Sequence, residues 1–214
     1  MPVTLLDHMG SDLTVVNAAR VSFAKESTMD GNELADKDVK LINYLAKHQH
    51  WSPFAHTFLQ YRIKAPIFVA RQLVKHQVGL SWNEVSRRYV DDDPEFYLPK
   101  DWRGRAENVK QGSSDNPVSD SKIITNWVIS AYQEADFQYR EMLKCGVAPE
   151  LARMVLPQAT YTEWYWSGSL YAFARVCKQR LDAHAQKETR EVAEQIAAHA
   201  ERIFPVSWNA LLSQ

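Results

Sequence analysis

The side chains best suited to chemistry gather in one stretch, residues 71–89, which reads RQLVKHQVGLSWNEVSRRY. Arginine and lysine can neutralise phosphate, and arginine adds a planar fork of donors. Asparagine, glutamine and glutamate can match the donor and acceptor edge of a base or of a flavin ring. The stretch therefore suits a phosphorylated heterocycle, although an exposed polar turn between a helix and a strand would have a similar composition.

A glycine-rich loop often cradles nucleotide phosphates, and this sequence lacks one. It contains only 7 glycines, and it has neither a GxGxxG nor a Walker pattern. If the protein binds a dinucleotide, its side chains must hold the phosphates.

A second basic set lies further along the chain, at Arg153, Arg175, Lys178 and Arg180, with His184 beyond. Arg180 and His184 stand at i and i+4, so they share a face if a helix continues through them. The set is either another part of a binding site or a solvated basic face.

Metal binding and nucleophilic catalysis find little support in the sequence. His48, His50 and His56 lack nearby cysteine or carboxylate partners, so no metal site is expected. Ser86 lacks the Gly-x-Ser-x-Gly elbow, and Cys177 lies in an apolar helical pattern typical of core packing. No side chain stands out as a catalytic nucleophile.

Composition and charge exclude several classes of protein. The 214 residues, of which 45% are hydrophobic and 24% charged, are typical of one globular domain. A formal net charge of -1 gives no whole-molecule attraction to nucleic acid or anionic lipid. The 2 cysteines form no disulfide framework, no signal pattern is visible, and no apolar run reaches the ~20 residues of a membrane helix. We expect a cytoplasmic protein (in the host cytoplasm if the source is viral) that binds neither nucleic acid nor membrane.

Hydrophobic periodicity predicts the elements that position these side chains. Helices are expected at residues 36–48, 67–76, 122–144, 149–155, 168–181 and 187–204, and strands at 57–64 and 85–89. Residues 91–120 show little periodicity and are interpreted as a long loop or lid. The aromatic residues Tyr161, Trp164, Tyr165 and Trp166 are expected in the core. The predicted fold is α+β, with a small antiparallel sheet packed with several helices in a single domain, residues 1–214.

Several segments resemble the flavin-dependent thymidylate synthase family. The signature of that family is Arg-His-Arg, seven or eight residues, then Ser, and here Lys75-His76-Gln77 precedes Ser86 by the same interval. Residues 83–89 match the continuation Asn-Glu-x-Ser-x-Arg-Tyr. The resemblance covers most of the chain in matching order, with 91–120 excepted, through AARVSF (18–23), KHQHWSPFAH (47–56), KAPIFVARQ (64–72), ARMVLP (152–157) and RLDAHAQ (180–186).

The resemblance implies a homotetramer that holds FAD at subunit junctions and shares its sites between subunits. The implied activity is reductive methylation of dUMP to dTMP, with methylenetetrahydrofolate as the carbon donor and NADPH-reduced FAD as the hydride source. In this family hydride, rather than a cysteine thiolate, activates the pyrimidine. That chemistry agrees with the lack of an evident nucleophile in the sequence.

Positions that match the family imply the site residues. Arg180 would be catalytic, because a fixed guanidinium can bind the uracil edge and stabilise the anion formed at N3. The implied dUMP-binding residues, of which Ser86, Arg88 and Arg153 address the phosphate, are Gln72, Leu73, Val74, Lys75, Glu84, Val85, Ser86, Arg87, Arg88, Arg153 and Arg180. The implied FAD-binding residues are His50, Ser52, Lys75, His76, Gln77, Glu84, Ser169 and Arg175.

The chain departs from the family pattern on the flavin side. Lys75 and Gln77 replace two arginines, which removes one fixed charge and both bidentate forks. Ser169, Tyr171 and Arg175 stand where the family commonly has Asn, Arg and Asn. We therefore expect weaker or differently oriented flavin binding, and we hypothesise that Arg175 restores the charge missing at Gln77.

Two other functions remain open. A related flavin-dependent enzyme could make hydroxymethyl-dUMP with similar nucleotide and flavin sites. A non-catalytic binder of single-stranded nucleic acid could use the basic and aromatic side chains, but such binders usually present a positive groove. The near-zero net charge and the carboxylate within residues 71–89 argue against that function.

Overall fold

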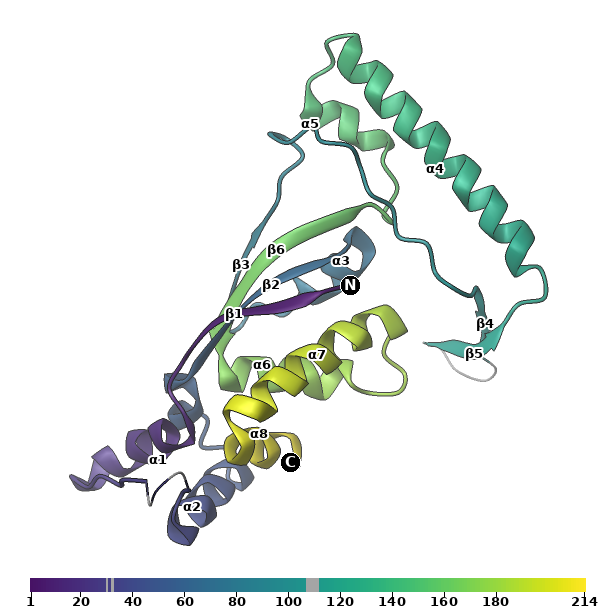
Figure 1. Cartoon of the computed structure of the whole chain (residues 1–214). Coiled ribbons are helices and arrows are strands. Elements are labelled where there is room, and N and C mark those ends of the chain that lie inside the picture. Colours follow the sequence, from purple (N-terminus) through teal and green to yellow (C-terminus); the bar gives the residue numbers. More distant parts are fainter. Residues whose placement is uncertain (30, 32, 107–111) are drawn as a thin grey trace. The chain divides into compact units, whose positions relative to one another are not determined.

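The computed structural model describes residues 1–29, 31, 33–106 and 112–214 (Figure 1). The chain forms two compact units. Unit 1 consists of Met1–Ile63, His76–Trp82 and Tyr165–Gln214, and unit 2 consists of Lys64–Lys75 and Asn83–Trp164.

A four-stranded sheet has the strand order β1-β2-β6-β3. Its strands are β1 (Val3–Met9), β2 (Phe58–Pro66), β3 (Leu80–Glu84) and β6 (Tyr161–Ser169). Strands β1 and β2 pair antiparallel from Val3 opposite Ile63 to Met9 opposite Phe58. In β2, Leu59, Tyr61 and Ile63 are buried while the residues between them are more exposed, which is the period-2 pattern that the sequence predicts.

The helices of unit 1 are α1 (Asp12–Arg20), α2 (Asp36–Lys47), α6 (Leu170–Arg180), α7 (Lys187–Ile203) and α8 (Pro205–Leu212), with 3-10 turns η1 (Val21–Phe23) and η2 (Ser52–His56). Figure 1 shows α6, α7 and α8 packed together, and α2 packs on α8. Phe173 of α6 lies at the centre of an aromatic core, with its ring centroid 5.1 Å from that of Tyr61 and 5.2 Å from that of Trp166. Burial of such large rings stabilises the unit mainly through the hydrophobic effect.

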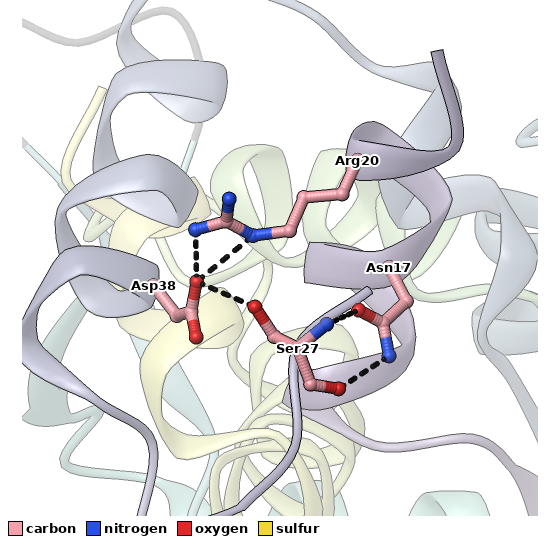
Figure 2. Close-up of polar contacts among 4 residues, drawn as sticks. All are labelled: Asn17, Arg20, Ser27 and Asp38. Carbon is pink, nitrogen blue, oxygen red and sulfur yellow. Dashed lines mark hydrogen bonds and ion pairs between the residues drawn. The ribbon is translucent and has the colours of Figure 1, made fainter. Parts of the chain in front are cut away.

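A polar network joins α1 to α2 (Figure 2). Oδ1 of Asp38 accepts hydrogen bonds from Arg20 Nε at 3.0 Å and from Ser27 Oγ at 3.1 Å. Asn17 and the Ser27 backbone exchange two further bonds, at 2.7 and 3.0 Å. Asp38 is fully buried, so these donors offset the cost of removing its charge from water. The network fixes Ser27, which follows η1, against both helices.

Unit 2 contains α3 (Ile67–Leu73), a hairpin of β4 (Arg103–Arg105) and β5 (Ser113–Pro117), α4 (Ser121–Lys144), α5 (Pro149–Ala152) and the 3-10 turn η3 (Arg153–Val155). The long helix α4 packs against α5 and η3. Tyr132 of α4 donates a hydrogen bond to the Tyr97 carbonyl at 2.9 Å and stacks on Phe96. Trp102 likewise donates to Thr125 at 2.9 Å, so α4 anchors the segment that precedes the hairpin.

The α+β class with an antiparallel sheet is confirmed, and each predicted helix is present within a few residues of its expected bounds. None of the helices in the described part of the chain is long and apolar enough to cross a membrane. The expectation that four aromatic residues lie in the core holds for Trp164 and Trp166, whereas Tyr161 is half-buried and Tyr165 is 47% exposed.

Two predictions about the strands and the loop were wrong. The strand expected at 85–89 lies earlier, at Leu80–Glu84, and the Tyr89 amide instead closes a turn onto the Ser86 carbonyl at 3.0 Å. The region 91–120 is not only a loop, because it contains the β4–β5 hairpin; residues 107–111 of that prediction lie outside the described residues. The polar sequences of both strands of the hairpin hide the alternation on which strand prediction depends.

Candidate active site

Two of the expected site residues, His76 and Arg180, form a direct side-chain hydrogen bond in unit 1. The Nε–H of Arg180, at the end of α6, donates a hydrogen bond to Nε2 of His76 at 2.9 Å. A guanidinium has donors only, so the imidazole must accept at Nε2 and carry its proton on Nδ1. Burial first, then the positive charges of Arg180 and Arg175, lower the pKa of His76. The geometry and the electrostatics both favour a neutral imidazole.

Two glycines place His76 beside α6. Gly79 has a φ of +77°, which few other residues adopt, and it completes the turn in which the Leu80 amide donates to the Gln77 carbonyl at 3.2 Å. A Cβ on Gly168 would lie only 2.4 Å from the Gly79 carbonyl oxygen. The end of β6 therefore approaches the turn closely because residue 168 has no side chain, and α6 begins directly after this contact.

The remaining expected flavin residues of unit 1 fall into two groups. His50, Ser52, Gln77 and Arg175 are exposed. Ser169 is buried, and its hydroxyl accepts the Ala172 amide at 3.2 Å as the N-cap of α6, which is a positioning role.

Sequence reasoning missed an aromatic pair beside these residues. The Trp51 side chain is 56% exposed, and its ring centroid lies 6.2 Å from that of Tyr171. The position of Trp51 between His50 and Ser52 is the signal that could have drawn attention to it. Exposed flat rings, a guanidinium and neutral hydrogen-bonding groups are the side chains that an aromatic ring system with a diphosphate requires. The donor set of unit 1 therefore fits a flavin dinucleotide.

Unit 2 contains a cavity of about 310 Å³. Glu84, Val85, Arg87 and Arg153 of the expected dUMP-binding set line it. The other lining residues were not predicted, and they are Lys64, Ile67, Val90, Asp92, Asp93, Glu95, Leu156, Tyr161, Thr162 and Glu163. A better prediction of β6 would have found several of them, because its first residues form one wall.

Side-chain contacts fix several groups around this cavity. Thr162 Oγ1 donates to Glu84 Oε1 at 2.8 Å. Arg87 donates to the Asp92 carbonyl at 2.8 Å and lies over the ring of Tyr139, with its guanidinium carbon 5.8 Å from the centroid. These contacts hold a carboxylate and a guanidinium at fixed points of one surface, where they can recognise a polar ligand.

Ser86 and Arg88 form a separate local pair. Arg88 Nε donates to Ser86 Oγ at 3.1 Å, and the Arg88 guanidinium lies 4.9 Å from the centroid of the exposed Tyr89 ring. A hydroxyl beside a guanidinium is a suitable arrangement for phosphate oxygens. Arg153 is exposed, and its Nε donates to the Glu150 carbonyl at 3.2 Å.

The other expected dUMP-binding residues lie at the end of α3, also in unit 2. Gln72 and Val74 are half-buried and Lys75 is exposed. Leu73 is fully buried, so its side chain packs in the core and is not open to a ligand in the isolated chain. The expected residues thus divide between the two units, with Lys75 in one and His76 in the other.

Comparisons with known proteins agree on one family. The model of the family described as "Thymidylate synthase complementing protein" matches residues 4–206. A flavin-dependent thymidylate synthase of Thermus thermophilus is 40% identical over 208 residues, which are 97% of this chain and 74% of that protein. Another, from Kosmotoga olearia, is 38% identical over 216 residues, 99% of this chain and 90% of that protein. The crystal structure of a UMP/dUMP methylase, PolB of Streptomyces cacaoi, bound with 5-Br dUMP, is similar with a TM-score of 0.87 at 32% identity, covering 99% of this chain and 94% of that one.

Proposed function

This chain belongs to the thymidylate synthase complementing protein family, and because its relatives from Thermus thermophilus and Kosmotoga olearia are flavin-dependent thymidylate synthases, we propose that it methylates dUMP to dTMP. The observation that carries this function most directly is the match of 97% of the chain to such an enzyme at 40% identity. The protein is accordingly a flavin-dependent methyltransferase. When bound, FAD reduced by NADPH supplies hydride, and methylenetetrahydrofolate supplies the one-carbon unit.

Arg180 is the proposed catalytic residue. Its Nε–H bonds to His76, which leaves the terminal nitrogens of the guanidinium to face a planar ligand edge. A guanidinium held in this way can donate to the uracil edge and stabilise negative charge at N3. Charge stabilised in a preorganised site requires no further reorganisation during the reaction.

The nucleotide is proposed to bind along the residues of unit 2. Ser86 and Arg88, which already pair at 3.1 Å, would bind the phosphate, and Gln72, Val74, Lys75, Glu84, Val85 and Arg87 would line the rest of the site. Leu73 would support this site only by packing.

Carboxylates outnumber basic side chains around the unit 2 cavity, so this cavity alone is poorly charged for a phosphate dianion. This supports the further proposal that subunits of a homotetramer share the site, with Arg153 of a second copy adding positive charge. Residues 1–214 would then act as one functional domain that includes both units. The protein would work in the cytoplasm, where free nucleotides are consumed.

The residues proposed to bind FAD in the assembled protein are His50, Ser52, Lys75, His76, Gln77, Glu84 and Arg175. Ser169 would contribute indirectly, as the cap that starts α6. Arg175 is exposed and close enough to His76 to lower its pKa. Its charge therefore acts on the same motif in which Gln77 replaces an arginine, which supports the hypothesis of compensation.

The buried Cys177 agrees with a mechanism that uses no thiolate. Burial raises the pKa of the Cys177 thiol, whose Sγ contacts the Ala193 carbonyl at 3.6 Å in the packing between α6 and α7. A buried, protonated thiol is a poor nucleophile. Hydride delivery to the pyrimidine removes the need for one.

Product analysis tests the proposal. The purified protein is incubated with FAD, NADPH, methylenetetrahydrofolate and dUMP, and the product is identified by its mass in mass spectrometry. Arg180→Ala is assayed in parallel as the control. dTMP is expected from the wild-type protein alone. Hydroxymethyl-dUMP would establish the alternative reaction, and a colourless protein that neither binds FAD nor consumes dUMP would refute the proposal.

UMP belongs in the same assay as a second substrate. The similar PolB structure has also been solved with 5-Br UMP, again with a TM-score of 0.87 and 32% identity. If the chain methylates UMP as fast as dUMP, its substrate class is wider than that of a thymidylate synthase. A strong preference for dUMP would support the narrower assignment.

A further inference from the structure

We propose that His76 is a positioning residue for catalysis: its neutral imidazole accepts the Nε–H of Arg180 at Nε2 and thereby orients the guanidinium toward the substrate. The inference rests on the proposed function, because an oriented Arg180 guanidinium has a role in catalysis only if the enzyme binds a substrate beside it. It assigns His76 a task that is separate from holding the flavin.

The geometry of an arginine explains why this bond matters. A guanidinium presents two donor edges, one made by Nε with a terminal nitrogen and one made by the two terminal nitrogens. His76 occupies Nε–H, and within the described residues no partner is found for the terminal nitrogens of Arg180. The bond thus reserves the outer edge for a ligand and removes rotational freedom from a side chain that would otherwise sample many rotamers.

The surroundings keep His76 in the accepting state. The charged groups of unit 1 that act on it are Arg180 and Arg175, both cationic and both from α6. The neighbouring turn at Gly79 packs against Ser169 and Ala172, neither of which titrates. A proton on Nε2 would replace the acceptor with a donor and set a third positive charge among the arginines.

The contribution of the His76–Arg180 pair to activity should decrease as the pH falls. His76 must be neutral for the bond, so the contribution of the pair is present above the pKa of His76 and lost as the pH falls through it. Because burial and, after it, the two arginines lower that pKa, the wild-type protein keeps the pair intact at neutral pH. An Arg175→Gln substitution removes one repelling cation, so the acid limb of kcat/KM for dUMP should move to higher pH.

Two substitutions separate positioning from mere packing. His76→Gln retains an acceptor on a side chain of comparable reach and cannot titrate, whereas His76→Phe keeps a ring and removes the acceptor. Both are assayed as the complete protein at saturating FAD, with bound flavin measured for each. We expect His76→Phe to lose roughly 100-fold in kcat/KM for dUMP, the cost of misplacing a catalytic group by about 1 Å. His76→Gln should recover most of this loss and should lack the acid limb of the wild-type profile.

Histidine-selective ¹⁵N NMR provides a readout that does not depend on turnover. At neutral pH the wild-type protein should show His76 protonated at Nδ1 and unprotonated at Nε2, with the signal assigned by its absence in His76→Gln. If this tautomer is found but no dTMP forms, the proposed function fails and the pair stands. If His76 carries its proton on Nε2, or if His76→Phe matches the wild-type kcat/KM at equal flavin occupancy, the inference is overturned even though the enzyme works. Should His76→Phe fail to fold, the tautomer and the pH profile of His76→Gln decide the question.

Discussion

The contact between Gly168 and Gly79 links stability to activity, and a single methyl group tests it. In Gly168→Ala the new Cβ would lie 2.4 Å from the Gly79 carbonyl oxygen and 2.5 Å from a Leu80 side-chain carbon. Backbone cannot yield as a flexible side chain does, so the end of β6 and the turn that follows His76 must move apart. Overpacking of this kind costs about 2 kcal/mol, which lowers the melting temperature by about 4–8 °C for a chain of this size.

The same displacement should reduce catalysis more than it reduces folding. His76 stands just before the turn, and α6, which carries Arg180, begins just after Gly168. A shift of about 1 Å at a catalytic group can lower the rate by roughly 100-fold. Thermal unfolding and kcat/KM for dUMP, both measured on the FAD-loaded protein, give the two quantities.

Gly104→Ala is the matched control. Gly104 also lies in a strand without a positive φ, but its added Cβ would meet nothing closer than 3.7 Å, which is ordinary van der Waals contact. It should change the melting temperature and the activity little. If Gly168→Ala were as stable and as active as Gly104→Ala, the account of how the turn is placed would be refuted.

Three further outcomes are expected. Asp38→Ala should lower the free energy of unfolding by about 3 kcal/mol, because it leaves the Arg20 and Ser27 donors of the network in Figure 2 without their acceptor. Urea unfolding measures this change, and a value below about 0.5 kcal/mol would contradict the network's role. Arg180→Ala should abolish dTMP formation while FAD absorbance is retained, and substantial residual turnover would remove its catalytic assignment. Arg175→Gln should weaken FAD retention on gel filtration more than it weakens dUMP affinity by calorimetry, and equal retention would argue against charge compensation.

The sequence predicted best where one face of an element is buried. Residues of α7 such as Val192, Ile196 and Ala200 are fully buried at helical spacing, and β2 alternates as expected. Strand β6 was missed although Trp164 and Trp166 are buried and Tyr165 is not. Its aromatic residues suggested core packing, and the alternation was hidden because both Tyr161 and Thr162 at its start are partly buried. The exposed Tyr165 is as aromatic as the two buried tryptophans beside it, so the sequence lacks the alternation between apolar and polar residues that would identify a strand.

The identity of the site residues could be predicted from the sequence, but their arrangement in space could not. Arg180 and His76 each belong to a recognisable motif, yet they stand 104 residues apart, and no spacing rule joins them. Their bond depends on a close approach that needs glycine at position 168, a requirement of tertiary packing. The cavity residues of unit 2 likewise come together only in the folded chain, since Thr162 reaches Glu84 because β6 lies beside β3 in the sheet.

The altered triplet can be understood from this arrangement. Replacing two arginines by Lys75 and Gln77 removes one fixed charge and both bidentate forks from the positions that flank His76, and both side chains are exposed. Arg175 places a cation near the same imidazole from α6, and it would act on His76 whether or not it also binds the flavin. Burial and Arg180 lower the pKa of His76, and Arg175 lowers it further, which favours the neutral imidazole that the bond to Arg180 requires. The replacement of an arginine by Gln77 would therefore alter the flavin side of the motif, while His76 would keep the neutral state that its proposed role beside Arg180 requires.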